Sequence, residues 1–209
     1  MTPIQSYNAL LAQKVIKEFK SRNIEGFYFE TKEEALKKVI EIVPENSTVS
    51  WGGSVTLHEI GLLDALKNGR YNVLDASDRS KGGAEMDRIA HQAFSSDYYF
   101  LSSNAISATG ELVNIDGIGN RVAALIYGPK NVIVIAGINK VEQNLEMAIN
   151  RAKTRAASLG VLSYTKNEIS SFEELLNKAQ GTGSQLVITM MSVFKERIKV
   201  ILVGESLGY

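Results

Sequence analysis

Short apolar segments alternate with amphipathic segments along most of this 209-residue chain, and this alternation constrains the fold more than any other feature. The clearest apolar segment, VIVIA at residues 132–136, predicts a strand that is buried on both faces. The pattern predicts further strands at residues 26–30, 49–51, 71–74 and 97–101, and helices at residues 6–19, 31–42, 56–67, 78–94 and 142–159. Such an order is typical of an α/β fold, in which helices cover both faces of a mostly parallel sheet.

The pattern changes after Gly160. A helix is predicted at residues 172–179, followed by two strands at residues 185–191 and 199–203. We expect one domain over residues 1–209, with a core at about residues 22–160. Residues 161–209 should then form a small C-terminal extension that contains strands and lies at one edge of the sheet.

Residues 104–121, NAISATGELVNIDGIGNR, are too polar for a core strand and too apolar for a solvent-exposed loop. We predict a half-buried hairpin that turns at Thr109-Gly110, with strand side chains pointing alternately to opposite faces. Asn114 and Asp116 then point together into a cleft. Glu111 belongs by alternation to the other face, but it begins the strand, where a distortion could turn it either way. In the alternative interpretation these side chains only cap their own backbone, which would account for two or three polar residues but not for all of them.

Two further segments follow predicted strands, and ligands of open α/β sheets bind beyond the carboxyl ends of strands. Gly52-Gly53-Ser54 and Thr56 follow one strand, and Asn139-Lys140 follow VIVIA. Glycines allow a ligand to approach the backbone, and the N–H groups of a following helix suit an anion. An ordinary capped turn, and a solvated Lys140, are the alternatives. The candidate ligand-binding residues are Gly52, Gly53, Ser54, Thr56, Asn104, Thr109, Asn114, Gly119, Asn120, Arg121, Asn139 and Lys140.

Three carboxylates are candidates for a catalytic base or nucleophile: Glu111, Asp116 and Glu59. Glu59 could instead complement the dipole at the start of a helix. We expect His58 and His91 to be surface or packing residues. Arg151 and Arg155 lie one helical turn apart and are expected on an exposed face.

Composition excludes several classes of function. The 23 basic and 23 acidic residues balance, so no overall basic field favours nucleic acid. The chain has no cysteine and two histidines, which excludes thiolate ligation of an iron–sulfur cluster and disfavours a transition-metal site; a carboxylate site for Mg²⁺ stays open. No signal peptide or spanning segment is predicted, so we expect a cytoplasmic protein without membrane contact.

Three segments together resemble the LUD-domain proteins, the lactate-utilisation family of the LutC type. They are WGGSVTLHEIG (51–61), SNAISATGELVNIDGIGNRVAALIYGP (103–129) and VIVIAGINK (132–140). The resemblance covers most of residues 1–159 and continues more weakly to VILVGESLGY (200–209). It implies a fold similar to the sugar-phosphate isomerase and CoA-transferase superfamily, in which the turn at Gly52–Thr56 would cradle a phosphate or a CoA-like group. Many relatives carry a cysteine-bearing segment near the C-terminus, and this chain lacks it.

The resemblance implies a non-redox component of a lactate-to-pyruvate oxidation system that binds a small anionic or phosphorylated ligand. Electrons would then pass through partner subunits, and no cofactor is assigned to this chain. One alternative is a free-standing isomerase or CoA/acyl transferase that uses a carboxylate. Another is an assembly subunit with a vestigial pocket, which pairs with itself or with partners.

Overall fold

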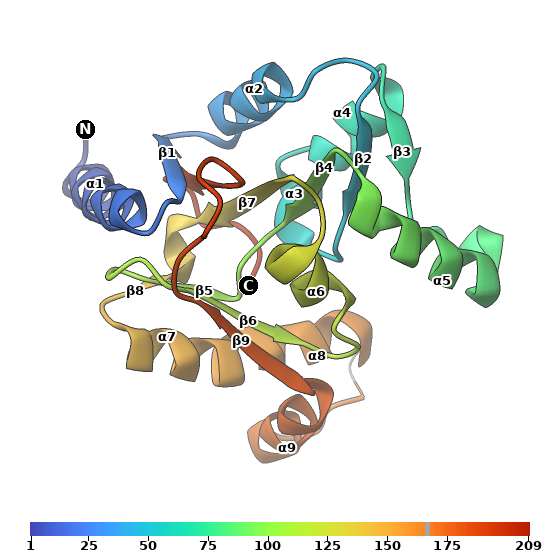
Figure 1. Cartoon of the computed structure of the whole chain (residues 1–209). Coiled ribbons are helices and arrows are strands. Elements are labelled where there is room, and N and C mark those ends of the chain that lie inside the picture. Colours follow the sequence, from blue (N-terminus) through green and yellow to red (C-terminus); the bar gives the residue numbers. More distant parts are fainter. Residues whose placement is uncertain (166–167) are drawn as a thin grey trace.

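The computed structural model describes residues 1–165 and 168–209, apart from the side chain of Arg79. Six parallel strands form the main sheet in the order β1-β10-β7-β4-β2-β3 (Figure 1). Their bounds are β1 (Glu25–Phe29), β10 (Ile198–Val203), β7 (Asn131–Gly137), β4 (Tyr98–Leu101), β2 (Thr48–Trp51) and β3 (Asn72–Leu74). Because all neighbours are parallel, all carboxyl ends lie at the same edge of the sheet.

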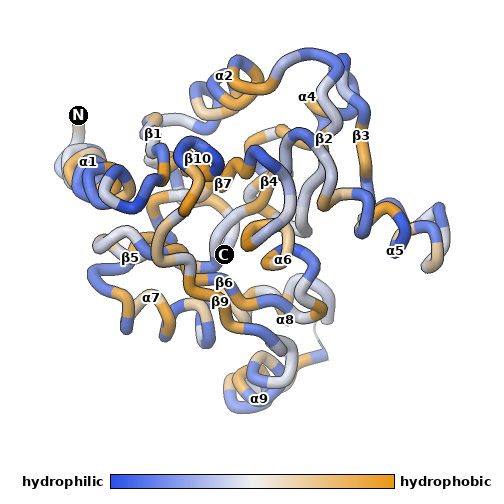
Figure 2. The backbone as a smooth tube through the Cα atoms, viewed as in Figure 1, coloured by the Kyte–Doolittle hydropathy of each residue, from blue (hydrophilic) through white to orange (hydrophobic). Residues whose placement is uncertain are grey.

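Helices cover both faces of this sheet, as the alternating pattern predicts. Val132 and Val134 of β7 pack against α1 and α6 on one face. Ile133 and Ile135 pack against α2, α3 and α4 on the other. The coloured tube in Figure 2 shows that hydrophobic residues gather along the central strands β7 and β10. The helices are α1 (Pro3–Ser21), α2 (Lys32–Ile42), α3 (Val55–Glu59), α4 (Leu62–Asn68), α5 (Gly83–Gln92), α6 (Asn120–Tyr127), α7 (Leu145–Arg151), α8 (Ala157–Thr165) and α9 (Phe172–Thr182).

Four shorter strands form a second sheet with the order β8-β5-β6-β9. They are β8 (Val141–Glu142), β5 (Ala105–Ser107), β6 (Leu112–Asp116) and β9 (Gln185–Thr189). The predicted hairpin is confirmed: β5 and β6 pair antiparallel, and Gly110 takes a φ of 96° in the turn, a conformation that glycine adopts without strain. Helices α7 and α8 lie under this sheet, on the side away from the main sheet (Figure 1).

Both C-terminal strands exist, but they do not lie together at one edge. β9 joins the second sheet beside β6, whereas β10 lies between β1 and β7 inside the main sheet. Five of the six residues of β10 are buried, as expected for a strand covered on both faces. Its nearly continuous apolar sequence is therefore the signal that this strand belongs in the sheet interior.

Three predicted helices are interrupted. The one predicted at residues 78–94 divides into a 3₁₀ turn and α5, which Gly82, with a φ of 77°, separates. The helix predicted at residues 56–67 is two helices, α3 and α4, which are separated at Gly61, a residue with a φ of 74°. The one predicted at residues 142–159 begins later and contains a π-helical segment, η4 (Ala152–Ala156), between α7 and α8. Such segments are often found at functional sites, and Ala156 indeed lines the cavity described below. Short 3₁₀ turns complete the chain at η1 (Arg79–Lys81), η2 (Ala93–Ser95) and η3 (Ile138–Lys140).

Candidate functional site: a cavity between the two sheets

A cavity of about 690 Å³ lies beyond the carboxyl ends of β2, β4 and β7, facing the second sheet and η4–α8. The segments after the three parallel strands supply one wall, the end of β6 supplies the second and the helices supply the third. The residues that line this cavity include Gly53, Ser54, Thr56, His58, Ser102, Ser103, Asn104, Asp116, Arg121, Lys140, Tyr164 and Tyr209. The structure thus brings together the three segments that were predicted to share a site.

Lys140 is the most unusual group in this cavity. It is only 2% exposed, and its Nζ donates hydrogen bonds to Thr56 Oγ1 at 2.9 Å and to Ser102 Oγ at 3.0 Å. Across the described part of the chain, no carboxylate lies within ion-pair distance of Nζ. Burial lowers the pKa of Lys140 from 10.5 to about 7, and the positive charges of Arg151 and Arg121 add to this effect, while Glu59 opposes it. The lysine is therefore not solvated, and its charge lacks a protein counter-ion.

Arg121 joins the hairpin to the main sheet. Its two Nη atoms donate to the carbonyl oxygens of Ser102 and Ile115 and to the side-chain oxygens of Asn104 and Asn114. The four acceptors therefore use all four Nη hydrogens. Arg121 contributes positive charge to the cavity wall, but the polar residues predicted as ligand contacts around it serve mainly to hold its guanidinium.

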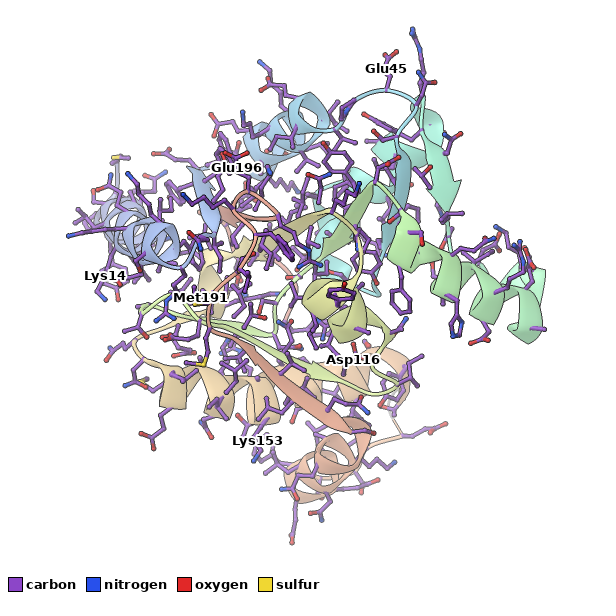
Figure 3. The ribbon with its side chains drawn as sticks, viewed as in Figure 1. Lys14, Glu45, Asp116, Lys153, Met191 and Glu196 are labelled. Carbon is purple, nitrogen blue, oxygen red and sulfur yellow. The ribbon has the colours of Figure 1, made fainter. Side chains whose placement is uncertain are left out.

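Asp116 is the one catalytic candidate that lines the cavity. Its carboxylate accepts hydrogen bonds from the backbone N–H groups of Gly119 and Val122, at 3.1 and 3.2 Å, and lies 3.6 Å from Arg121 Nε. Figure 3 shows Asp116 beside α6, whose first turn it caps. Its bonds are those of a helix-capping residue.

The two other catalytic candidates lie outside the cavity wall. Glu111 is at the far end of the hairpin, where it forms an ion pair with Arg22 at 2.5 Å and accepts a hydrogen bond from Thr109 at 2.6 Å. Glu59 is exposed and accepts a hydrogen bond from the Gly208 N–H group. The structure therefore does not bring the three carboxylates together.

The remaining candidates support the wall from behind. Asn114 is fully buried below Arg121, and Asn139 accepts a hydrogen bond from Leu207 N that fixes the C-terminal segment. Gly119 has a φ of 89° at the start of α6, immediately before Asn120. These residues shape the site, and neither they nor Thr109 belong to the cavity wall.

Arg151 was expected on an exposed helix face, and this expectation is wrong. It is 4% exposed and donates hydrogen bonds to the backbone oxygens of Asn139 and Asn104, with Glu142 at 3.8 Å. The second sheet covers this face of α7, which helix periodicity could not reveal. Arg151 thus fixes the backbone next to Lys140 and adds positive charge behind it.

Sequence reasoning missed Ser102 and Ser103, which directly follow β4. The rule that selected Gly52 and Lys140, the carboxyl end of a strand, also applies to these serines. The sequence of η4 and α8 did not indicate that these helices line the cavity, because the small residues in this wall are common in any packed helix.

Gly52 and Gly53 are expected to respond differently to substitution. A Cβ at Gly52 would lie 2.7 Å from Cγ of Arg121, and this side chain cannot move away easily because four hydrogen bonds hold its guanidinium. A Cβ at Gly53 would meet no heavy atom within 4 Å. Gly52→Ala should therefore cost about 1–3 kcal/mol of stability by overpacking. Gly53→Val should stay within about 0.5 kcal/mol of the parent. Denaturant unfolding measures both; equal stabilities, or the reverse order, would contradict the described packing.

No helix in residues 1–165 or 168–209 has the length and apolarity to cross a membrane. Within the same residues, no three side chains of the His, Cys, Asp and Glu types gather as metal ligands.

The LUD domain family model matches residues 12–203. The crystal structure of a DUF162 family protein from Deinococcus radiodurans shares the fold, with a TM-score of 0.52 at 14% sequence identity, covering 95% of this chain and 98% of that one. The structure of eIF2B delta from Chaetomium thermophilum superposes with a TM-score of 0.35 at 19% identity, over 69% of this chain and 57% of that one. No curated protein matches the chain significantly.

Proposed function

The chain belongs to the LUD domain family, and from this premise we propose that it binds a small carboxylate or phosphate anion in the cavity between its two sheets. We further propose that it does so as a non-redox component of a lactate-to-pyruvate oxidation system, in line with a family name that refers to lactate utilisation. With no cysteine in its sequence, the chain would leave electron transfer to partner subunits.

One observation carries the proposal: Lys140 is buried at the cavity wall without a carboxylate partner among the described residues. Taking a cation out of water costs several kcal/mol unless an opposite charge compensates it. A ligand anion beside Nζ would supply that charge and accept the third N–H of the ammonium group, which the two hydroxyls leave unused.

The charges around Lys140 support an anion rather than a cation. Arg121 and Arg151 each have a neighbouring carboxylate, Asp116 at 3.6 Å and Glu142 at 3.8 Å. Among the described residues, Lys140 is therefore the cation of this cluster without a carboxylate within ion-pair distance, since Glu59 acts on it only from farther away. The cavity volume of about 690 Å³ falls within the range of sites for small molecules and exceeds what lactate alone would fill. A larger phosphorylated ligand therefore also fits the proposal.

A binding screen tests this proposal. Thermal shift followed by calorimetry would compare lactate, pyruvate, sugar phosphates, nucleotides and CoA. We expect at least one anion to stabilise the protein, and Gly53→Val to weaken its binding without unfolding the chain, since the new side chain would occupy the open wall. If no anion binds, or if the Gly53 variant binds as tightly as the parent, the assignment is wrong.

Anion affinity should decrease as the pH rises above about 7. Burial, with Arg151 and Arg121 adding to it, lowers the pKa of Lys140 to about 7, so the free protein loses the ammonium charge above this pH. A ligand that binds the charged form raises this pKa and takes up a proton on binding, so affinity should fall by up to about tenfold per pH unit. Calorimetry between pH 6 and 9 measures the effect, and a flat profile would exclude Lys140 as the group that holds the anion.

A further inference from the structure

The hydrogen bonds of Lys140 leave one position of Nζ free. A neutral amine has two N–H donors and one lone pair. The hydroxyl oxygens of Thr56 and Ser102, at 2.9 and 3.0 Å, can accept both donors. The lone pair then takes the remaining tetrahedral position. Nζ forms no third hydrogen bond among the described residues, and Lys140 forms part of the cavity wall.

We propose that Lys140 is a nucleophile that forms a reversible imine with a small anionic carbonyl compound bound in the cavity. This inference deepens the proposed function and rests on it, because the anion must first bind beside Nζ. Lysine nucleophiles are activated by desolvation or by neighbouring cations. Lys140 has both: it is 2% exposed, and the charges of Arg121 and Arg151 disfavour its protonation.

The chemistry needs no other reactant. The neutral amine attacks the carbonyl carbon, a C–N bond forms, and a proton moves from nitrogen to oxygen to give a carbinolamine. The former carbonyl oxygen then leaves as water once it is protonated, and the C=N bond forms. The hydroxyls of Thr56 and Ser102 contact Nζ directly and are placed to relay these protons.

The charge of the site favours an anionic carbonyl compound over a neutral one. The protonated imine keeps the positive charge of the lysine, and a carboxylate or phosphate on the same molecule neutralises it where no described carboxylate lies within ion-pair distance of Nζ. A 2-oxo acid places its carboxylate next to the carbonyl carbon, so one small molecule satisfies both requirements. A phosphorylated ketone could react in the same way, but its anionic group lies farther from the carbonyl carbon.

Reductive trapping tests the inference. The full chain is incubated with pyruvate and sodium cyanoborohydride, and the product is analysed by intact mass and peptide mapping; a parallel sample contains dihydroxyacetone phosphate. We expect a single adduct at Lys140 with one of the two probes. It should form faster as the pH rises through the midpoint of Lys140, which lies near 7 at low probe concentration and higher once the probe saturates the site. The probe that reacts distinguishes a 2-oxo acid from a phosphorylated ketone. Lactate, which lacks a carbonyl, should bind without giving an adduct.

Lys140→Arg keeps a positive charge but cannot form an imine, so it should give no adduct at position 140 whatever its affinity for pyruvate. If pyruvate and lactate bind but the parent protein gives no adduct, or gives one only at other lysines, the imine is wrong and anion binding stands. If no anion of the binding screen binds, these three included, both proposals are wrong; if another anion binds but neither probe does, only the imine is wrong. Mapping of the parent protein decides the case even if the arginine variant does not fold.

Discussion

Replacing Lys140 by methionine should lower the affinity for the bound anion by about 10- to 100-fold, because a hydrogen bond to a charged group contributes about 1.5–3 kcal/mol. Methionine has a similar length and no charge, so it can fill the space between Thr56 and Ser102. The loss should be largest below pH 7, where the parent lysine is charged. Calorimetric titration with the strongest ligand from the screen measures it.

Stability must be measured in parallel, because the same variant should fold well. Burial lowers the folded-state pKa of Lys140 to about 7, below the 10.5 of the unfolded chain, so the unfolded chain binds the extra proton between these values. This lysine's contribution to stability is therefore present above about pH 10.5 and lost as the pH falls through about 7. The methionine variant should lack this dependence and be at least as stable as the parent at pH 6. Lys195→Met, on an exposed residue before β10, is the control and should bind normally.

Replacing Arg121 by methionine should destabilise the protein by about 3–5 kcal/mol, the usual cost of removing one partner from a buried charged network. The guanidinium hydrogen-bonds to Ser102, Asn104, Asn114 and Ile115, so its loss leaves buried oxygens without donors. Asp116 also loses its neighbouring cation. At about 2–4 °C per kcal/mol for a chain of this size, calorimetry should show a clear fall in Tm.

Arg88→Met gives the matched control for this prediction. Arg88 is 56% exposed on α5 and, among the described residues, pairs only with Glu85 across one turn. Its replacement should leave the Tm unchanged. A similar Tm for the two variants would mean that Arg121 does not join the hairpin to the main sheet.

The sequence predicts that three segments share one edge of the main sheet, and these segments do line one cavity, whereas ligand binding there stays a prediction. Parallel strands bring their carboxyl ends to one edge, so Ser54, Thr56 and Lys140, which follow predicted strands, could be placed at that edge. The polar excess in the hairpin likewise identified Asn104, Asp116 and Arg121. Periodicity and glycine positions are local properties of the sequence, and they were sufficient to place these segments at one edge of the sheet.

The roles of these residues could not be predicted, because they depend on long-range packing. Asn104 and Asn114 bind Arg121 and Asp116 caps α6, and of these three only Asn104 and Asp116 also line the cavity. Glu111 pairs with Arg22, which is 89 positions away in the sequence. The burial of Lys140 arises only when the segments after three strands meet, and no single stretch of sequence encodes it.

The most direct test of the anion site is the titration of the Lys140 amine itself. NMR of the lysine side chains, assigned by comparison with Lys140→Met, would follow its ionisation without ligand and with a saturating anion. We expect a midpoint near 7 in the free protein and a clearly higher midpoint in the complex. An ordinary lysine midpoint in the free protein, or one that the anion does not move, would contradict the assignment of Lys140 as the anion-binding group.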